Sequence, residues 1–425
     1  RIAIPQADEL QRLLANLVLH VNADRKPLPR FWYFPRGERA VVVMTSDNHA
    51  GNNTNVGARF AAEETVSPSG CSVADWECVR STAYVYNASL TGDAEAATWQ
   101  AKGFEVALHV NTNCADYTPA TLPGFYTTQK ASFEATFPSL DPIRTNRTHC
   151  IAWSDWTTQA QVELNHGIRL DTTYYYWPSM WVNDRPGFFT GSGMPMRFAN
   201  LDGSIVDVYQ ATTHMTDESG QLYPATVNAL LDGAVGPNGY YGAFTTNIHT
   251  DNPGLSDSIA AAIVASAQAR SVPVVTARQM LEWLDGRNTS TFDAVTWSGS
   301  VLGFGVTPGS GANGLRALLP TQSAAGSLQG LTRDGASVSY ATETIKGVSY
   351  ATFDATAGAY EAWYGTPPPD TTAPVISGLT ATPGATGTAT VQWQTDEPAT
   401  TVLDYGTDPG LAGAPVRNAG FGDPL

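Results

Sequence analysis

The sequence is poor in charged residues, and basic residues are the scarcer kind. Charged residues make up 15% of the 425 residues, and 23 Lys and Arg stand against 39 Asp and Glu, for a net charge of -16. Nucleic acid and anionic membranes both need a basic face on their partner, so this balance argues against both as partners. The sequence also contains no apolar run long enough to span a membrane.

Cysteine is scarce as well, with four residues at positions 71, 78, 114 and 150 and no CxxC pair. A small, even number without CxxC favours two disulfides, Cys71–Cys78 and Cys114–Cys150, over a zinc cluster. Paired cysteines, few lysines and Thr-rich loops together predict an extracellular protein. Because the chain opens at Arg1 without Met or a signal-peptide pattern, we expect a mature or trimmed form.

Between Phe31 and about Arg287, short apolar strands alternate with helical stretches, a pattern typical of a parallel sheet or barrel. The predicted strands are residues 40–46, 104–109, 143–149, 167–172, 204–210, 241–248 and 272–276. The predicted helices are residues 93–102, 127–137, 157–165, 226–231, 255–270 and 277–284. These elements predict a mixed α/β fold, a seven-stranded and incomplete (β/α) barrel followed by β-sandwich-like modules.

The chain is too long for one ordinary core, and its composition changes mark further segments. Leucines and a valine at helical spacing in residues 8–22 predict an N-terminal helix that packs on the main domain. Beyond Asn288 the pattern becomes strand-like, and the strands predicted around Trp393 resemble the first half of a fibronectin type III domain. The predicted segments are an N-terminal helical extension at 1–30, the barrel at 31–288, an accessory β domain at 289–365, a Pro-rich linker at 366–373 and the partial fibronectin-like domain at 374–425.

Reactive side chains gather at the ends of the predicted strands. Val41–Met44 is apolar throughout, as in a buried parallel strand, and it leads into Asp47, Asn48 and His49. Five histidines follow different strands, and an aspartate ends another: His49, His109, His149, His214, His249 and Asp171. Because strand ends meet at one rim of a barrel, we expect these side chains to converge on a site.

In chain order, these strand ends resemble the motifs of the NodB-homology polysaccharide deacetylases. Thr45-Ser46-Asp47-Asn48 is similar to the first motif, Gly103–His109 to the second, Arg147 to the third, Asp171 before Tyr174–Trp177 to the fourth, and Asn247-Ile248-His249 to the fifth. The resemblance covers about residues 38–286. It implies a divalent metal, by expectation zinc, that activates water for removing acetyl groups from a glycan.

The resemblance also implies a role for each matched residue. Asp47 would be the general base and His249 the general acid, while Arg147 would orient the base and Asp171 would position a charged neighbour. Two metal-ligand positions depart from the family, because Asn48 stands for an aspartate and Asn113 for a histidine. We favour a rearranged site in which His109 and His149 bind the metal with an oxygen from Asn48 or Asp47, and with Asn113 near it. His49 is an alternative ligand.

Aromatic residues after the strand ends are candidates for stacking on sugar rings. The candidate substrate-binding residues are Trp153, Tyr175, Trp177 and Arg197. We therefore predict a secreted, monomeric, metal-dependent deacetylase of acetylated polysaccharide. Two other functions stay open: a glycan-binding protein on a degenerate deacetylase fold, and a glycoside hydrolase or lyase that pairs Asp47 with Asp171 or Asp155.

Overall fold

The computed structural model describes residues 3–23, 25–49, 55–86, 92–175, 187–188, 191–365, 373–385, 388–397, 399–403 and 416–418. The chain forms two compact units, Arg1–Thr366 and Pro367–Leu425.

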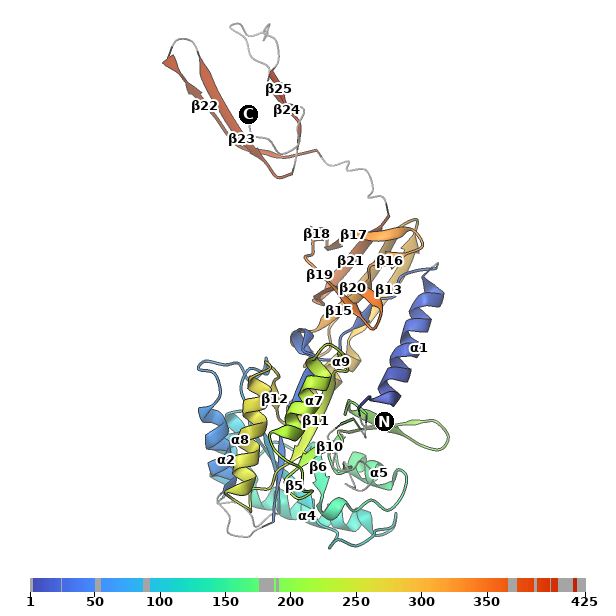
Figure 1. The fold of residues 1–425 in the computed structure, drawn as a ribbon, viewed down its shortest axis with the longest axis vertical. Coiled ribbons are helices and arrows are strands. Elements are labelled where there is room, and N and C mark those ends of the chain that lie inside the picture. The colour runs from blue at the N-terminus through green and yellow to red at the C-terminus, as the bar shows by residue number, and fades with distance from the viewer. Residues whose placement is uncertain are drawn as a thin grey trace. The chain divides into compact units, whose positions relative to one another are not determined.

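Two sheets of mainly parallel strands form the α/β part of the first unit (Figure 1). The first sheet contains, in spatial order, β10 (Thr213–Thr216), β11 (Gly242–Asn247), β2 (Ala40–Val43) and β12 (Val274–Val275). The second contains β3 (Thr45–Asn48), β4 (Thr82–Val85), β5 (Glu105–Val110), β6 (Thr145–Thr148), β7 (Leu170–Asp171), β9 (Ile205–Gln210) and β8 (Met196–Ala199). All pairs in these two sheets are parallel except β8 with β9.

Strands β2 and β3 follow one another and link the two sheets. Strand β2 lies between β11 and β12, whereas β3 pairs with β4. Met44 joins them, and every residue from Ala40 to Asn48 is buried. This burial on both faces is why the strand contains an unbroken apolar run rather than alternating residues.

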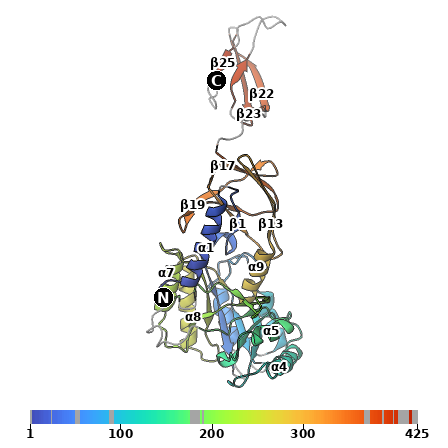
Figure 2. The ribbon, with the colours of Figure 1, turned by 90° about the vertical axis from the view of Figure 1, so that its right-hand side faces the viewer.

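Helices cover the strands on opposite sides. They are α2 (Asn55–Thr65), α3 (Asp93–Ala101), α4 (Leu122–Thr136), α5 (Thr158–Asn165), α7 (Ala225–Val235), α8 (Leu255–Gln268) and α9 (Ala277–Thr289). Helices α7 and α8 lie on one side and α4 and α5 on the other (Figure 2). Apolar residues of α7, α8 and β2 share one core cluster, which includes Leu231, Ile263 and Val42. Helix α9 begins at a capping box made by Thr276 and Gln279.

Each predicted strand of the α/β region contains a strand of the structure, and each predicted helix overlaps a helix. The structure is a mixed α/β fold. The prediction missed α2 and the strands β4, β8 and β10. Strand β4 begins at Thr82, and β10 begins at Thr213 and ends at Thr216. These two strands therefore lack the long apolar run from which the other strands were predicted.

Antiparallel strands follow α9. One sheet contains β1 (Arg30–Phe31), β15 (Arg316–Pro320), β20 (Val348–Asp354) and β19 (Ala341–Ile345). The other contains β13 (Thr291–Ser298), β14 (Val301–Thr307), β21 (Gly358–Tyr364), β17 (Gly326–Arg333) and β16 (Gln322–Ser323), with β18 (Ala336–Ser337) paired to β17. Tyr360 of the second sheet contacts Phe353 of the first, with ring centroids 5.5 Å apart. The two sheets therefore share a core.

The N-terminal helix α1 (Gln6–Asn22) is present, but its leucine face is exposed. Leu10 is 66% exposed and Leu14 is 62% exposed, so these leucines are not the residues through which the helix contacts the rest of the unit. Polar contacts on another face of α1 attach the helix to the rest of the first unit. Arg12 is buried and donates to the Tyr240 carbonyl at 2.6 Å, and Asp8 accepts from the Ser192 amide at 2.7 Å. In both views α1 runs beside the antiparallel sheets (Figures 1 and 2).

The second unit contains two hairpin pairs, β22 (Ile376–Pro383) with β23 (Ala389–Thr395) and β24 (Thr401–Leu403) with β25 (Val416–Asn418). Strands β22, β23 and β24 overlap the three strands predicted there, at residues 375–382, 388–395 and 400–405, whereas β25 was not predicted. The fibronectin type III resemblance stays a prediction. The predicted linker at 366–373, apart from its last residue, lies outside the described residues. Among the helices described, none has the length and apolar character needed to cross a membrane.

Candidate active site

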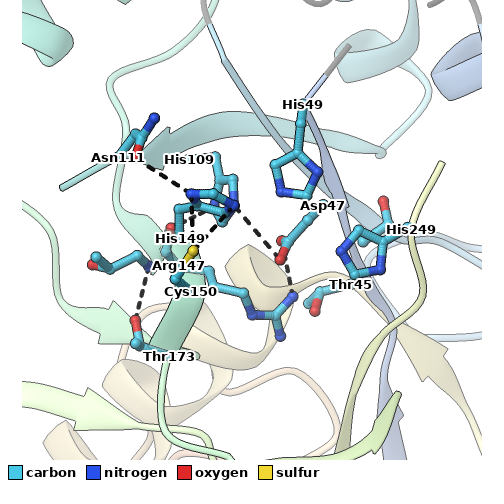
Figure 3. Close-up of polar contacts among 12 residues, drawn as sticks. Thr45, Asp47, His49, His109, Asn111, Arg147, His149, Cys150, Thr173 and His249 are labelled. Atoms are coloured by element: carbon cyan, nitrogen blue, oxygen red, sulfur yellow. Dashed lines mark hydrogen bonds and ion pairs between the residues drawn. The ribbon is translucent and has the colours of Figure 1, made fainter. Parts of the chain in front are cut away.

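Four histidines, an aspartate and an arginine meet at the carboxyl ends of β3, β5, β6 and β11 (Figure 3). Asp47 lies in β3 and His49 follows it, His109 lies in β5, Arg147 lies in β6, and His149 and His249 follow β6 and β11. Parallel strands bring their carboxyl ends to one edge of a sheet, so residues distant in sequence become neighbours.

His49, His109 and His149 form a group that is suited to a metal ion. Each offers a ring nitrogen, and the three nitrogens lie within 4.8 Å of one another. The ring centroids are 4.6 Å apart for His49 and His149 and 5.2 Å apart for the other two pairs. Imidazole nitrogen is a preferred ligand of zinc and related divalent metals, and three protein ligands are typical of catalytic zinc sites.

Hydrogen bonds fix which nitrogen of two of these rings is available. His109 donates from Nδ1 to the Arg147 carbonyl at 2.7 Å, and His49 donates from Nδ1 to Asp251 Oδ2 at 2.8 Å. The Nε2 atoms of both rings are buried and have no hydrogen-bond partner among the residues that the structure describes. A buried nitrogen without a partner is costly unless something binds it, so both atoms fit the role of metal ligand.

Burial also favours the neutral form of His109 and His149. Desolvation lowers the pKa of His109 to about 4, even though Asp47 nearby raises it. Desolvation and the neighbouring His49 lower the pKa of His149 as well. Only the neutral imidazole has a lone pair to offer a metal, so the environment favours the binding form.

Asp47 is a buried carboxylate surrounded by cationic and imidazole groups. Arg147 Nη1 donates to its Oδ1 at 3.1 Å, and His109 Nε2 lies 3.7 Å from Oδ2. Burial by itself raises the pKa of this carboxyl. The charges of His109, Arg147 and His249 more than offset this effect and hold the pKa well below its usual range. Asp47 is therefore ionised and able to accept a proton.

His249 is held in the opposite protonation state by a second aspartate. Its backbone N–H and its Nδ1 both bond to Asp217, at 2.9 and 2.8 Å, and Ser256 also donates to Asp217. Burial lowers the pKa of His249, but the bond to Asp217 and the charge of Asp47 raise it to about 9. His249 is therefore protonated at neutral pH, with its Nε2 free of Asp217. The site thus combines a proton acceptor, a proton donor and a group of metal-binding nitrogens.

Comparisons with known proteins find similarity among solved structures, at low identity. No protein-family model matches the chain, and no curated protein matches it significantly. Among solved structures, the polysaccharide deacetylase Bc1974 from Bacillus cereus matches with 12% identity and a TM-score of 0.31, over 56% of this chain and 92% of that chain. The carbohydrate deacetylase Agd3 matches with 10% identity and a TM-score of 0.38, over 79% of this chain and 66% of that chain.

A bacterial fucosidase also matches, with 8% identity and a TM-score of 0.30, over 76% of this chain and 93% of that chain. TM-scores below 0.5 do not distinguish between these enzymes. The functional proposal below therefore rests on the geometry of the site.

Asn48 and Asn113, the two asparagines predicted near the metal, both make hydrogen bonds to other residues of the chain. Asn48 is buried and donates from Nδ2 to Thr250 Oγ1 at 3.0 Å, which ties β3 to the end of β11. Asn113 is exposed, and its backbone N–H bonds to Asn111 Oδ1 at 2.7 Å. His49 takes part in the group instead.

Asp171 supports the site through hydrogen bonds to neighbouring side chains. Among the described residues its carboxylate accepts hydrogen bonds from Gln159, Gln210 and Thr173 rather than from Arg147. Thr173 Oγ1 in turn accepts from the backbone N–H of Thr148 at 2.9 Å. Asp171 thereby steadies the strand end that carries His149.

Arg147 contacts the residue it was predicted to orient. Besides Asp47, its guanidinium donates to the Thr172 carbonyl, Thr213 Oγ1 and the Thr246 carbonyl, at 3.2, 2.8 and 2.8 Å. These bonds hold the guanidinium in one position between β6, β10 and β11.

Three of the four predicted substrate-binding residues lie in the part of the chain that the structure describes. Trp153 stacks on Phe198 with centroids 5.5 Å apart. Tyr175 is partly buried, and burial raises its pKa to about 12. Arg197 pairs with Asp207 at 3.4 Å. Trp177 lies outside the described residues.

Three neighbours of the site were not predicted: Tyr86, Asp217 and Asp251. Tyr86 follows β4, and its ring stacks on His109 with centroids 5.4 Å apart. Asp217 follows β10, so a correct assignment of β4 and β10 would have pointed to both. His214, which was expected at the rim, is buried in β10, donates from Nδ1 to the Thr212 carbonyl and packs on Phe244.

Both predicted disulfides, Cys71–Cys78 and Cys114–Cys150, are confirmed. The second lies against the site, since Cys150 Sγ is 3.4 Å from each ring nitrogen of His149.

Proposed function

We propose that this protein is a metal-dependent hydrolase that removes acetyl groups from the sugars of a polysaccharide, on a (β/α) barrel. The observation that carries the proposal is the three-histidine group beside an ionised, arginine-held Asp47 and a protonated, aspartate-held His249. The two disulfides support a secreted protein.

The ligands of the metal would be His49, His109 and His149, because two of these rings turn a buried, unbonded Nε2 to the group. Three neutral nitrogens suit zinc better than magnesium or calcium, which prefer oxygen. When bound, a metal of this kind polarises the acetyl carbonyl and makes a water molecule more acidic.

Asp47 takes the proton of the attacking water. Its Oδ1 is engaged by Arg147, so Oδ2, on the side of the histidine group, is the oxygen that accepts the proton. Arg147 also prevents the carboxylate from rotating, since three further bonds fix its own position: to the Thr172 carbonyl after β7, to Thr213 of β10 and to the Thr246 carbonyl of β11. The water oxygen then forms the new bond to the acyl carbon.

His249 supplies the proton for the leaving group. Asp217 occupies its Nδ1, so the proton is delivered from Nε2 to the sugar nitrogen or oxygen as the bond to the acyl carbon breaks. The products are acetate and the free amine or hydroxyl of the sugar, and the proton gained by Asp47 balances the one lost by His249.

A glycoside hydrolase built on Asp47 and Asp171 finds no support in this geometry. Such enzymes need two carboxyl groups that face the sugar. Asp171 is fully buried, and both of its oxygens accept hydrogen bonds from neighbouring side chains.

The test combines bound metal with acetate release. The purified protein is analysed for metal by mass spectrometry and then incubated with acetylated hexosamine oligomers, with Asp47→Asn as the comparison. Bound metal and acetate release that Asp47→Asn lowers by about 100-fold or more support the proposal. Reducing ends or unsaturated sugars without acetate would mean chain cleavage, and glycan binding without metal or product would mean a binding protein.

A further inference from the structure

Two histidine–aspartate pairs flank Asp47, and both are made in the same way. In each pair the aspartate accepts from the backbone N–H and from Nδ1 of its histidine. Asp251 does so for His49 at 3.0 and 2.8 Å, and Asp217 does so for His249 at 2.9 and 2.8 Å. The backbone bond fixes the carboxylate relative to the main chain, and the Nδ1 bond fixes the plane and tautomer of the ring.

The free nitrogens of the two rings have different surroundings. Nε2 of His49 is buried, has no hydrogen-bond partner among the described residues and belongs to the group with His109 and His149. Nε2 of His249 instead lies 3.6 Å from Glu218 Oε1, and the Glu218 side chain is 66% exposed. The first ring therefore turns its lone pair to a set of nitrogens, whereas the second turns an N–H toward the open side of the site.

We propose that Asp251 is a positioning residue for the metal site: it holds His49 in the orientation of a ligand and places a negative charge at Nδ1, on the other side of the imidazole from Nε2. This inference rests on the metal site of the proposed function. The carboxylate would make the imidazole of His49 more basic, and part of its negative charge would in this way favour a divalent cation held by three imidazoles.

The connection also spans two parts of the fold. His49 follows β3 and Asp251 follows β11, and a second pair of bonds joins the same strand ends, from Thr250 N–H to the Asp47 carbonyl at 3.0 Å and from Asn48 Nδ2 to Thr250 Oγ1 at 3.0 Å. The Asp251 side chain is 17% exposed, so its bond to His49 is largely shielded from water and salt. Removal of the carboxylate would break its bonds to the backbone N–H and to Nδ1 of His49, while the two bonds to Thr250 would still join the strand ends.

The experiment compares Asp251→Ala with Asp217→Ala, the matched pair on the other histidine. Zinc affinity of the metal-free proteins is measured by competition with a chromophoric chelator. Asp251→Ala is expected to bind zinc about 10- to 100-fold more weakly than wild type, which is the usual effect of removing such a partner. Asp217→Ala is expected to bind zinc as wild type does and to lose acetate release, because its histidine is the proton donor.

Cobalt gives a second readout that a general loss of stability would not produce. The visible spectrum of the cobalt-loaded protein reports the ligand geometry, so it should change in Asp251→Ala and stay unchanged in Asp217→Ala. Asp251→Asn keeps an acceptor oxygen without the charge and should have an intermediate zinc affinity. It also replaces Asp251→Ala if that variant does not fold, as judged by circular dichroism of the metal-free protein.

Wild-type zinc affinity and an unchanged cobalt spectrum in both Asp251 variants would overturn the inference. This outcome can be distinguished from the outcome of the test of the proposed function. Zinc binding that depends on Asp251 in a protein that releases no acetate would support the inference and contradict the deacetylase, and Asp251-independent zinc binding with acetate release would do the reverse.

Discussion

Arg147 holds two members of the site at once, because its side chain bonds to Asp47 and its main-chain carbonyl bonds to His109. The distances are 3.1 Å from Nη1 to Asp47 Oδ1 and 2.7 Å from His109 Nδ1 to the carbonyl oxygen. One strand end therefore orients the proton acceptor and sets the tautomer of a proposed metal ligand. The side chain and the main chain can be separated by mutation, since substitution of Arg147 removes only the side-chain bond.

Arg147→Lys is expected to lower kcat for acetate release by about 100-fold while leaving zinc content unchanged. Lysine carries a single ammonium group and cannot reproduce the planar fork that reaches Asp47, Thr213 and the Thr246 carbonyl together. Arg316→Lys, a partly exposed residue paired with Asp354, is the control and should keep wild-type activity. A loss of zinc in Arg147→Lys would show that the guanidinium supports the metal site itself.

The two disulfides should differ in their effect on the site although both stabilise the fold. Loop-entropy estimates give about 4 kcal/mol for the 36-residue separation of Cys114–Cys150 and about 2 kcal/mol for the 7-residue separation of Cys71–Cys78. Replacement of Cys114 and Cys150 by serine should weaken zinc binding as well, because Cys150 lies against His149. The same change at Cys71 and Cys78 should lower the free energy of unfolding and spare zinc affinity. Equal zinc affinities in the two double variants would contradict this.

Glu63 should make the protein less stable as the pH rises. Burial raises the pKa of its carboxyl to about 7, although Arg59 and the bond from Ser81 lower it. Between about pH 4.5 and 7 the native state keeps a proton that the unfolded state has released, so the free energy of unfolding falls as pH rises through that range. Glu63→Gln has no titrating group at this position. The free energy of unfolding of this variant, relative to that of wild type, should therefore be about 3 kcal/mol greater at pH 8 than at pH 4.5.

Urea unfolding followed by tryptophan fluorescence at both pH values measures this difference. The neighbouring Glu64→Gln, whose side chain is exposed and paired with Lys102, is the control. A Glu63→Gln difference that is the same at both pH values would mean that the carboxyl is ionised throughout.

The sequence predicted the ends of the strands well, because a buried parallel strand contains a continuous run of apolar residues. Val41–Met44 is apolar throughout, and the reactive residues follow at once. The convergence of His49, His109, His149 and His249 is then a consequence of parallel pairing. His214 was an exception, since its position within β10 rather than after it turns its ring into the core.

The sequence could not predict which side chains hydrogen-bond to one another across different strands. His49 and Asp251 are separated by 202 positions, and their bond depends on the register of β11 against β2, the strand that β3 continues. Asp217 was missed because β10 was not recognised. The exposed leucines of α1 show a further limit, since helical spacing of apolar residues identifies a helix but does not show which face it buries.

The central claim is that His49, His109 and His149, rather than the two asparagines, hold the metal. Zinc content per chain, measured by mass spectrometry after dialysis against a limited chelator concentration, tests it in wild type, His49→Ala, His149→Ala and Asn113→Ala. We expect about one zinc per chain in wild type and Asn113→Ala and a loss of most of it in both histidine variants. Full occupancy in His49→Ala together with loss in Asn113→Ala would contradict the account.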